Sequence, residues 1–168
     1  MSSPTQTRDR PSDDAQAVPP TGPSDYGTLN ATYVALLATV AVATSRPTDG
    51  RSAIHGAELP LLGLATFALA KTVAKEKIGT WVRNPFVEES NEHKPGSPRG
   101  HGLRHAVGEL LTCPRCVGAW AALGVVGTRA ASPRAGRVAA AVLAAAGIND
   151  FLQAGFRYAT ERANAAAG

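Results

Sequence analysis

The two cysteines of the chain lie three residues apart, in the segment Cys113-Pro114-Arg115-Cys116. Proline disrupts the interior of a helix but fits its first position, so Pro114 predicts that a helix begins here. Both thiols then lie on the first turn, where free backbone N–H groups and the helix dipole favour a thiolate. Arg115 adds positive charge to this turn. The pair could therefore form a disulfide, bind a metal ion, or pack as two reduced thiols.

Metal binding would need further ligands, because tetrahedral zinc takes four and the cysteines supply two. His101 and His105 lie one helical turn apart just upstream, and Glu109 precedes Cys113 by four residues. These ligand types suit zinc, although their order and spacing match no standard zinc finger. A zinc site made by Cys113, Cys116, His101 and His105 is therefore one hypothesis, and we expect no other cofactor.

Thiol redox chemistry is the second hypothesis for the cysteine pair. A cysteine pair at a helix start resembles the local chemistry of thioredoxin-type sites, but no βαβ pattern surrounds this one. The simplest interpretation is that Cys113 and Cys116 are reduced and pack in a helical elbow. The three interpretations stay open at the level of the sequence.

A basic and apolar segment, KTVAKEKIGTWVRNPF at residues 71–86, predicts a helix that lies in a membrane interface. Its apolar residues recur at helical spacing on one face, and its cations lie elsewhere. Tryptophan suits the headgroup level of a bilayer, and lysine suits anionic lipid. The residues expected to contact lipid are Lys71, Lys75, Lys77, Trp81 and Arg83. The alternative is a cytoplasmic extension of the preceding helix.

Asp150 is a carboxylate within an otherwise apolar segment. Carboxylates inside a membrane are costly and usually face the interior of a helical bundle. Asp150 could converge with the cysteines and Glu109 on one polar cluster, or it could pair with Lys71 or Arg157. We expect the simple ion pair.

Four apolar segments must position these residues. A helix of 20 residues is about 30 Å long, which is the thickness of a bilayer core. A soluble bundle would need a regular polar stripe on each helix, and the first and third segments lack one. A cleaved signal peptide is disfavoured as the first segment, because the region before it is long and acidic. The predicted spans are residues 26–45, 57–74, 113–131 and 138–156.

The sequence thus predicts an all-α integral membrane bundle of about four spans, with a cytoplasmic interfacial helix. Residues 1–25 are expected to be a disordered tail, because they are polar and rich in proline and serine. Residues 26–162 form the membrane domain, in which residues 88–105 are a loop. Residues 163–168 are a short tail.

The chain carries 17 Lys+Arg against 13 Asp+Glu, a net charge of +4, and a mean hydropathy of -0.07. Most of the basic residues fall in the N-terminal tail, the middle loop and the C-terminal tail. The positive-inside rule then predicts a protein of the bacterial cytoplasmic (inner) membrane with both termini in the cytoplasm. The expected partner is the lipid bilayer, with a second copy or another membrane protein left open. No nucleic-acid-binding signature is present.

Three stretches resemble a bacterial family of small membrane proteins, domain of unknown function 1360, which includes a sporulation-associated membrane protein. They are LATFALAKTVAKEKIGTWVRNPF (64–86), AVGELLTCPRCVGAW (106–120) and AGINDFLQ (146–153). The specific pattern ELLTCPxCxGxW falls here on Glu109, Leu110, Leu111, Thr112, Cys113, Pro114, Cys116, Gly118 and Trp120. The resemblance implies an integral membrane protein without an established activity.

No catalytic triad, P-loop or dinucleotide fingerprint indicates an enzymatic reaction. We expect a multi-span bacterial membrane protein with a structural or interaction role, in which the elbow at residues 109–120 packs against the interfacial helix and the last span. The alternative is a metal or thiol-redox site at the cysteine pair. The candidate functional residues are Glu109, Cys113, Pro114, Cys116, Trp120 and Asp150.

Overall fold

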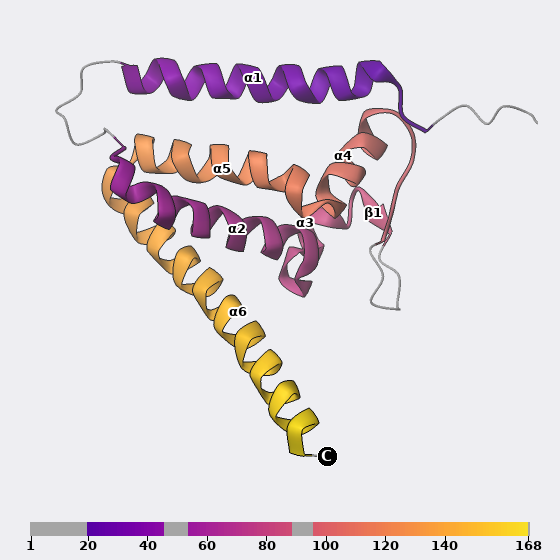
Figure 1. Cartoon of the computed structure of the whole chain (residues 1–168). Coiled ribbons are helices and arrows are strands. Elements are labelled where there is room, and N and C mark those ends of the chain that lie inside the picture. Colours follow the sequence, from indigo (N-terminus) through magenta and orange to yellow (C-terminus); the bar gives the residue numbers. More distant parts are fainter. Residues whose placement is uncertain (1–19, 46–53, 89–95, 168) are drawn as a thin grey trace, which may run out of the picture.

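The structure is a computed structural model that describes residues 20–45, 54–88 and 96–167. These residues are mostly helical (Figure 1). The long helices are α1 (Pro23–Ser45), α2 (Leu59–Lys75), α4 (Leu103–Thr112), α5 (Pro114–Ala131) and α6 (Pro133–Ala167). The short elements are η1 (Gly56–Glu58), η2 (Lys77–Gly79), α3 (Thr80–Arg83), β1 (Val87–Glu88) and β2 (Ser97–Pro98).

Prolines lie in the first turns of four of the five long helices. Pro23, Pro114 and Pro133 are the first residues of α1, α5 and α6, and Pro60 lies in the first turn of α2. The fixed backbone angle of proline suits this position, where its missing N–H would have no helical partner. The expectation that a helix begins at Pro114 is therefore confirmed.

Helix α2 lies at the centre and packs against both α5 and α6, which also contact each other (Figure 1). The buried side chains at these contacts are mostly alanine, which lets helix backbones approach closely. One cluster contains Leu62, Ala65, Val125, Ala140 and Ala144, and the other contains Ala70, Ala74, Leu111, Val117 and Ala121. The core is therefore thin, with few large side chains in it.

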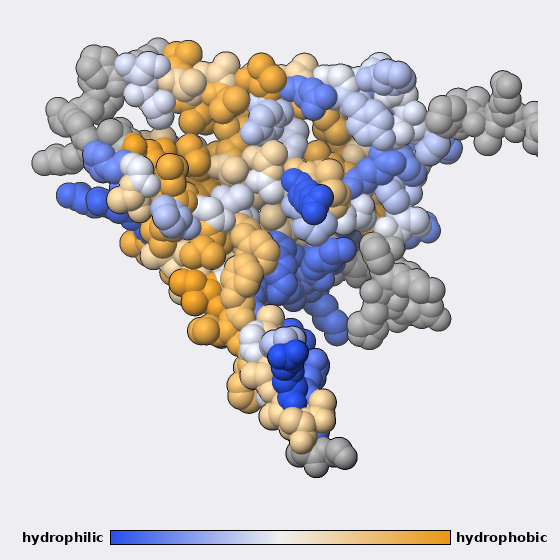
Figure 2. All heavy atoms as spheres, viewed as in Figure 1, coloured by the Kyte–Doolittle hydropathy of each residue, from blue (hydrophilic) through white to orange (hydrophobic). Residues whose placement is uncertain are grey.

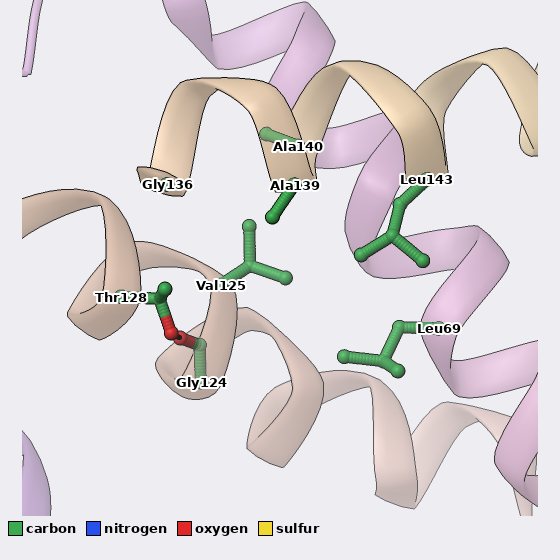
Figure 3. A pocket seen from close by; sticks show the side chains of 8 residues that line it. All are labelled: Leu69, Gly124, Val125, Thr128, Gly136, Ala139, Ala140 and Leu143. Carbon is green, nitrogen blue, oxygen red and sulfur yellow. Dashed lines mark hydrogen bonds between the residues drawn. The ribbon is translucent and has the colours of Figure 1, made fainter. Parts of the chain in front are cut away.

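A small cavity of about 100 Å³ remains where the three helices meet. Its walls are largely aliphatic, with Leu69 of α2 and Leu143 of α6 facing Val125 of α5 (Figure 3). The hydroxyl of Thr128 also lines the cavity, but its proton is already donated to the Gly124 carbonyl at 2.7 Å. The cavity thus has room for a few apolar atoms, and its lining residues include no charged side chain, histidine or cysteine that would make it a catalytic or metal site.

Helix α1 lies along α5 and also contacts α4, yet it buries none of its own residues (Figure 1). Its large apolar side chains, such as Val34 and Leu37, are exposed. Helix α6 also exposes large apolar side chains in the part beyond its contact with α2, such as Leu152 and Phe156. Figure 2 shows apolar surface along α1 and α6.

The bounds of the predicted spans differ most at α6. Helix α6 begins at Pro133 and continues to Ala167, so it is longer at both ends than the predicted span at residues 138–156. No proline or extended residue interrupts it, and it also includes residues 163–167 of the tail, which was expected to be helical and fraying. Residues 23–25 likewise belong to α1 instead of the disordered tail, whereas residues 1–19 lie outside the described part of the chain.

The expected loop at residues 88–105 contains regular structure where it is described. Strands β1 and β2 pair antiparallel, with Val87 opposite Pro98, and α4 begins at Leu103. Gly108 of α4 packs directly on this pair, since a Cβ atom there would lie 2.6 Å from the Phe86 carbonyl oxygen and 2.8 Å from the Pro98 Cβ atom. The loop prediction was therefore wrong for these residues, and residues 89–95 lie outside the description.

The single interfacial helix predicted at residues 71–86 is also corrected. Helix α2 ends at Lys75, Glu76 is extended, and the chain folds back through η2 into the short α3. Gly79 makes this reversal sterically possible, because a Cβ atom there would lie 2.6 Å from the Val73 carbonyl oxygen. Apolar spacing predicted the helical tendency but not the tertiary turn that divides it.

An ion pair joins the start of α2 to the end of α5. Arg129 Nε and Nη2 donate to the two Glu58 carboxylate oxygens at 2.8 and 2.9 Å. The Arg129 side chain is 2% exposed, and its Nη1 atom is buried without a partner among the described residues. A buried guanidinium of this kind depends strongly on its carboxylate.

We predict that Glu58→Leu lowers the thermal midpoint of the detergent-purified protein, because it leaves the Arg129 guanidinium buried without its carboxylate. The double variant Glu58→Leu/Arg129→Met should recover much of the loss, since it removes both charges. Thermal unfolding followed by circular dichroism measures both, with the exposed Arg134→Met as the control. A double variant no more stable than Glu58→Leu would contradict this account of the pair.

Candidate functional site

The cysteine pair lies at a sharp break between two helices. Helix α4 ends at Thr112, Cys113 is extended, and α5 begins at Pro114, with the two helices bent by 92°. Proline enforces the break, because it lacks the N–H that would continue the α4 hydrogen-bond ladder. The elbow is therefore fixed by the same residue that starts α5.

The two sulfur atoms lie close together on the first turn of α5. Cys116 Sγ donates to Cys113 Sγ at 2.7 Å, and the Cys116 backbone N–H donates to the same sulfur at 3.4 Å. Both cysteines are free, Cys113 is half-buried, and Cys116 is exposed. The expectation that both thiols share one helical turn is confirmed.

The histidines do not join the cysteines. His105 Nδ1 lies 3.1 Å from the Gly100 carbonyl oxygen and its Nε2 atom lies 3.7 Å from Glu109 Oε1, while His101 is exposed. In the described ranges, no three His, Cys, Asp or Glu side chains are placed to share a metal ion. The structure therefore does not assemble the four expected zinc ligands, and zinc binding stays a prediction.

Glu109 and Trp120 both contact α1. The Tyr26 hydroxyl donates to Glu109 Oε2, and the ring of Tyr33 meets the ring of Trp120 edge-on at 5.4 Å between centroids. The sequence analysis missed both tyrosines. Their spacing of seven residues places them on one face of α1 two turns apart, and this was the signal that could have found them.

Asp150 of α6 forms its ion pair with Lys71 of α2. Lys71 Nζ lies 3.0 Å from Asp150 Oδ2 and 3.2 Å from Glu76 Oε1. The expected simple ion pair is confirmed, with Lys71 as the partner out of the two cations considered, and the alternative convergence of Asp150 with the cysteines is not formed. One helical turn before Lys71, the ring of Phe67 stacks on Phe151 at 5.0 Å between centroids. These two contacts link α2 to α6.

Arg83 was expected to contact lipid, and the structure corrects this. The side chain is 8% exposed and turns back onto the end of α2. Its Nη1 atom donates to the Val73 carbonyl and, at 3.2 Å, to the Glu76 carbonyl. The Val73 carbonyl lies in the last turn of α2, where a helix leaves carbonyls without intrahelical partners, whereas the Glu76 carbonyl also accepts from the Gly79 backbone N–H at 3.0 Å. Helical spacing could not reveal this role, because it requires the chain reversal at Gly79.

Of the other four residues expected to contact lipid, Lys71 is half-buried in its ion pairs with Asp150 and Glu76, and the remaining three are exposed. Lys75 and Lys77 are exposed, and Trp81 is 77% exposed. They lie at the end of the bundle where α2 meets α3, near the ion pair of Lys71. An indole and two ammonium groups at one end of an apolar helix are the groups that favour a lipid headgroup layer.

The fold and this site define a class of small helical proteins with several helices long and apolar enough to cross a membrane. Within that class, the family described as "Protein of unknown function (DUF1360)" matches residues 61–156, and the chain belongs to this family. The match begins in α2 and ends in α6, so it includes the elbow, Arg83 and Asp150. Helix α1 lies outside it.

A similar protein is "Sporulation protein YjcA" of Bacillus subtilis (strain 168). It is 32% identical over 107 residues, which cover 60% of this chain and 91% of that protein. No solved structure matches the chain. The family resemblance predicted from the ELLTCPxCxGxW segment is therefore confirmed.

We predict that Arg83→Met lowers the free energy of unfolding by roughly 2 kcal/mol, because the Val73 carbonyl at the end of α2 loses its guanidinium donor. Lys75→Met is the matched control, since it removes an exposed cation from the same end of α2 and should change stability little. Thermal unfolding in detergent compares the two. Equal midpoints for the two variants would show that Arg83 does not stabilise the end of α2.

Proposed function

We propose that this chain is a multi-span protein of the bacterial cytoplasmic membrane with a structural or assembly role. Helices α1, α2 and α6 are each long and apolar enough to cross a bilayer, and the bent pair α4 and α5 would supply a fourth crossing. The proposal thus keeps the four spans expected from the sequence, with α4 as an added arm at the start of the third.

The observation that carries this proposal is the outward placement of large apolar side chains. Helix α1 buries none of its 23 residues, and α6 exposes Val138, Val142, Ile148 and Phe156. In water such surfaces would be unfavourable by about 25 cal/mol for each Å² left exposed. In a lipid core they face hydrocarbon, and the backbone groups in the interior of each helix are already hydrogen-bonded within that helix.

The distribution of polar groups supports an orientation. Helices α1, α2 and α5 alternate in direction, so the start of α1, the end of α2 and the start of α5 lie at one end of the bundle (Figure 1). This end carries Lys75, Lys77, Arg99 and Arg104. The positive-inside rule favours its placement in the cytoplasm, with both termini on that side.

The role we propose is contact with other membrane components. The exposed faces of α1 and α6 suit lipid, a second copy of the chain or another membrane protein. The similarity to a sporulation protein makes spore formation the first process in which to test such a role. A zinc ion at the cysteines would need ligands beyond those that the described residues bring together.

We predict that the full chain, expressed in a bacterium, stays in the membrane pellet after washing with alkaline carbonate and is released by detergent. The physical reason is that its apolar helices would be embedded in hydrocarbon and not held by surface charge. A peripheral membrane protein of the same cells is the control and should wash off. Release of the chain into the carbonate supernatant would refute the membrane-spanning proposal.

We also predict the topology. Reporters inserted within residues 88–102 or fused after Gly168 should report the cytoplasm, and a reporter within residues 48–53 should report the outside. Charge distribution sets this orientation. Replacing both Lys75 and Lys77 by glutamine should increase the fraction of molecules that insert with the inverted orientation. A wild-type chain with the opposite pattern would contradict the charge argument while leaving membrane insertion intact.

A further inference from the structure

The first turn of α5 places two thiols within reach of a covalent bond. The sulfur atoms of Cys113 and Cys116 are 2.7 Å apart, both cysteines are free, and Cys116 is exposed. A bonded pair of sulfurs lies about 2.0 Å apart, so closing the bond needs a shift of well under 1 Å. We propose that Cys113 and Cys116 form a reversible dithiol–disulfide pair that exchanges with small-molecule disulfides.

The surroundings of the two sulfurs give them different roles in the exchange. Cys113 Sγ accepts hydrogen bonds from the Cys116 backbone N–H and from the Cys116 thiol. It also lies at the N-terminal end of α5, beside Arg115, where the helix dipole favours negative charge. Cys113 therefore carries the thiolate and acts as the nucleophile, and Cys116 retains its proton until the second step.

The exchange balances in two steps. The Cys113 thiolate attacks one sulfur of a disulfide RSSR, which forms a Cys113–SR mixed disulfide and releases RS⁻. Cys116 then gives its proton to RS⁻ and attacks Cys113 Sγ, which closes the Cys113–Cys116 bond and releases the second RS⁻. Two electrons pass from the protein dithiol to RSSR. An excess of small-molecule thiol reverses both steps.

The position of the cysteine pair connects its oxidation state to the contacts between helices. Cys113 is the residue that connects α4 to α5 at the 92° bend. Helix α4 carries Glu109, which accepts from Tyr26 of α1. Closing a ring across residues 113–116 restricts the backbone of the elbow itself, so the oxidation state acts at the joint between α1, α4 and α5.

The test uses the full chain in detergent with oxidised glutathione as the probe. After an acid quench, remaining thiols are alkylated and the intact mass is measured. We expect wild type to pass from two alkylated thiols to none, without a retained glutathione, and to regain both on treatment with reduced glutathione. Cys116→Ser should stop with one glutathione on Cys113, because no second thiol displaces it.

The remaining variants test which of the two cysteines is the nucleophile. Cys113→Ser should form its mixed disulfide at least about tenfold more slowly than Cys116→Ser, because Cys116 alone lacks the donors that favour a thiolate. Arg115→Ala should slow the first step of the intact pair, and Arg134→Ala, at an exposed position elsewhere, should not. A wild-type chain that retains two glutathiones, or that keeps two alkylatable thiols, would overturn the proposal. Equal rates for the two serine variants would overturn the assignment of the nucleophile.

Discussion

Close approach of α2, α5 and α6 is the constraint on which the rest of the structure depends. Alanines such as Ala65, Ala70 and Ala144 fill the contacts, so the backbones lie near one another and little room remains for large side chains between them. Large apolar residues are therefore displaced to the outside, where they create the surface that suits lipid. Polar clamps then fix the helices: Glu58–Arg129 joins α2 to α5, and Lys71–Asp150 joins α2 to α6.

The sequence predicted the features that depend on local chemistry. Pro114 sets the start of α5 and the thiols share its first turn, as expected. Asp150 also forms an ion pair, because a carboxylate in an apolar segment needs a cation wherever the chain folds, although its partner Lys71 is distant along the chain. The sequence could not predict features that depend on the chain folding back on itself. Arg83 resembles an interfacial cation until the reversal at Gly79 brings it to the end of α2. The contact between Tyr26 and Glu109 likewise joins residues that are distant along the chain.

The family match covers one part of the molecule and leaves α1 outside it. Residues 61–156 hold the three packed helices and the elbow, whereas α1 precedes them. Helix α1 is attached by a few specific groups, namely the Tyr26 hydroxyl and the edge-on ring of Tyr33, and not by a buried face. Its contacts fall on Glu109 and Trp120, which belong to the motif that identified the family. The motif thus forms the elbow of the core and also provides the residues that contact α1.

Helix α6 continues well past the bundle, and its last residues stand clear of the other helices (Figure 1). From Asp150 to Ala167 the rise of about 1.5 Å per residue gives a rigid arm about 25 Å long. The Lys71–Asp150 ion pair and the stacked rings of Phe67 and Phe151 lie at the base of this arm. These two contacts hold α6 against α2 at the base of the arm. A small change in the angle between α6 and α2 at that point therefore displaces the C-terminal end of α6 by several ångströms.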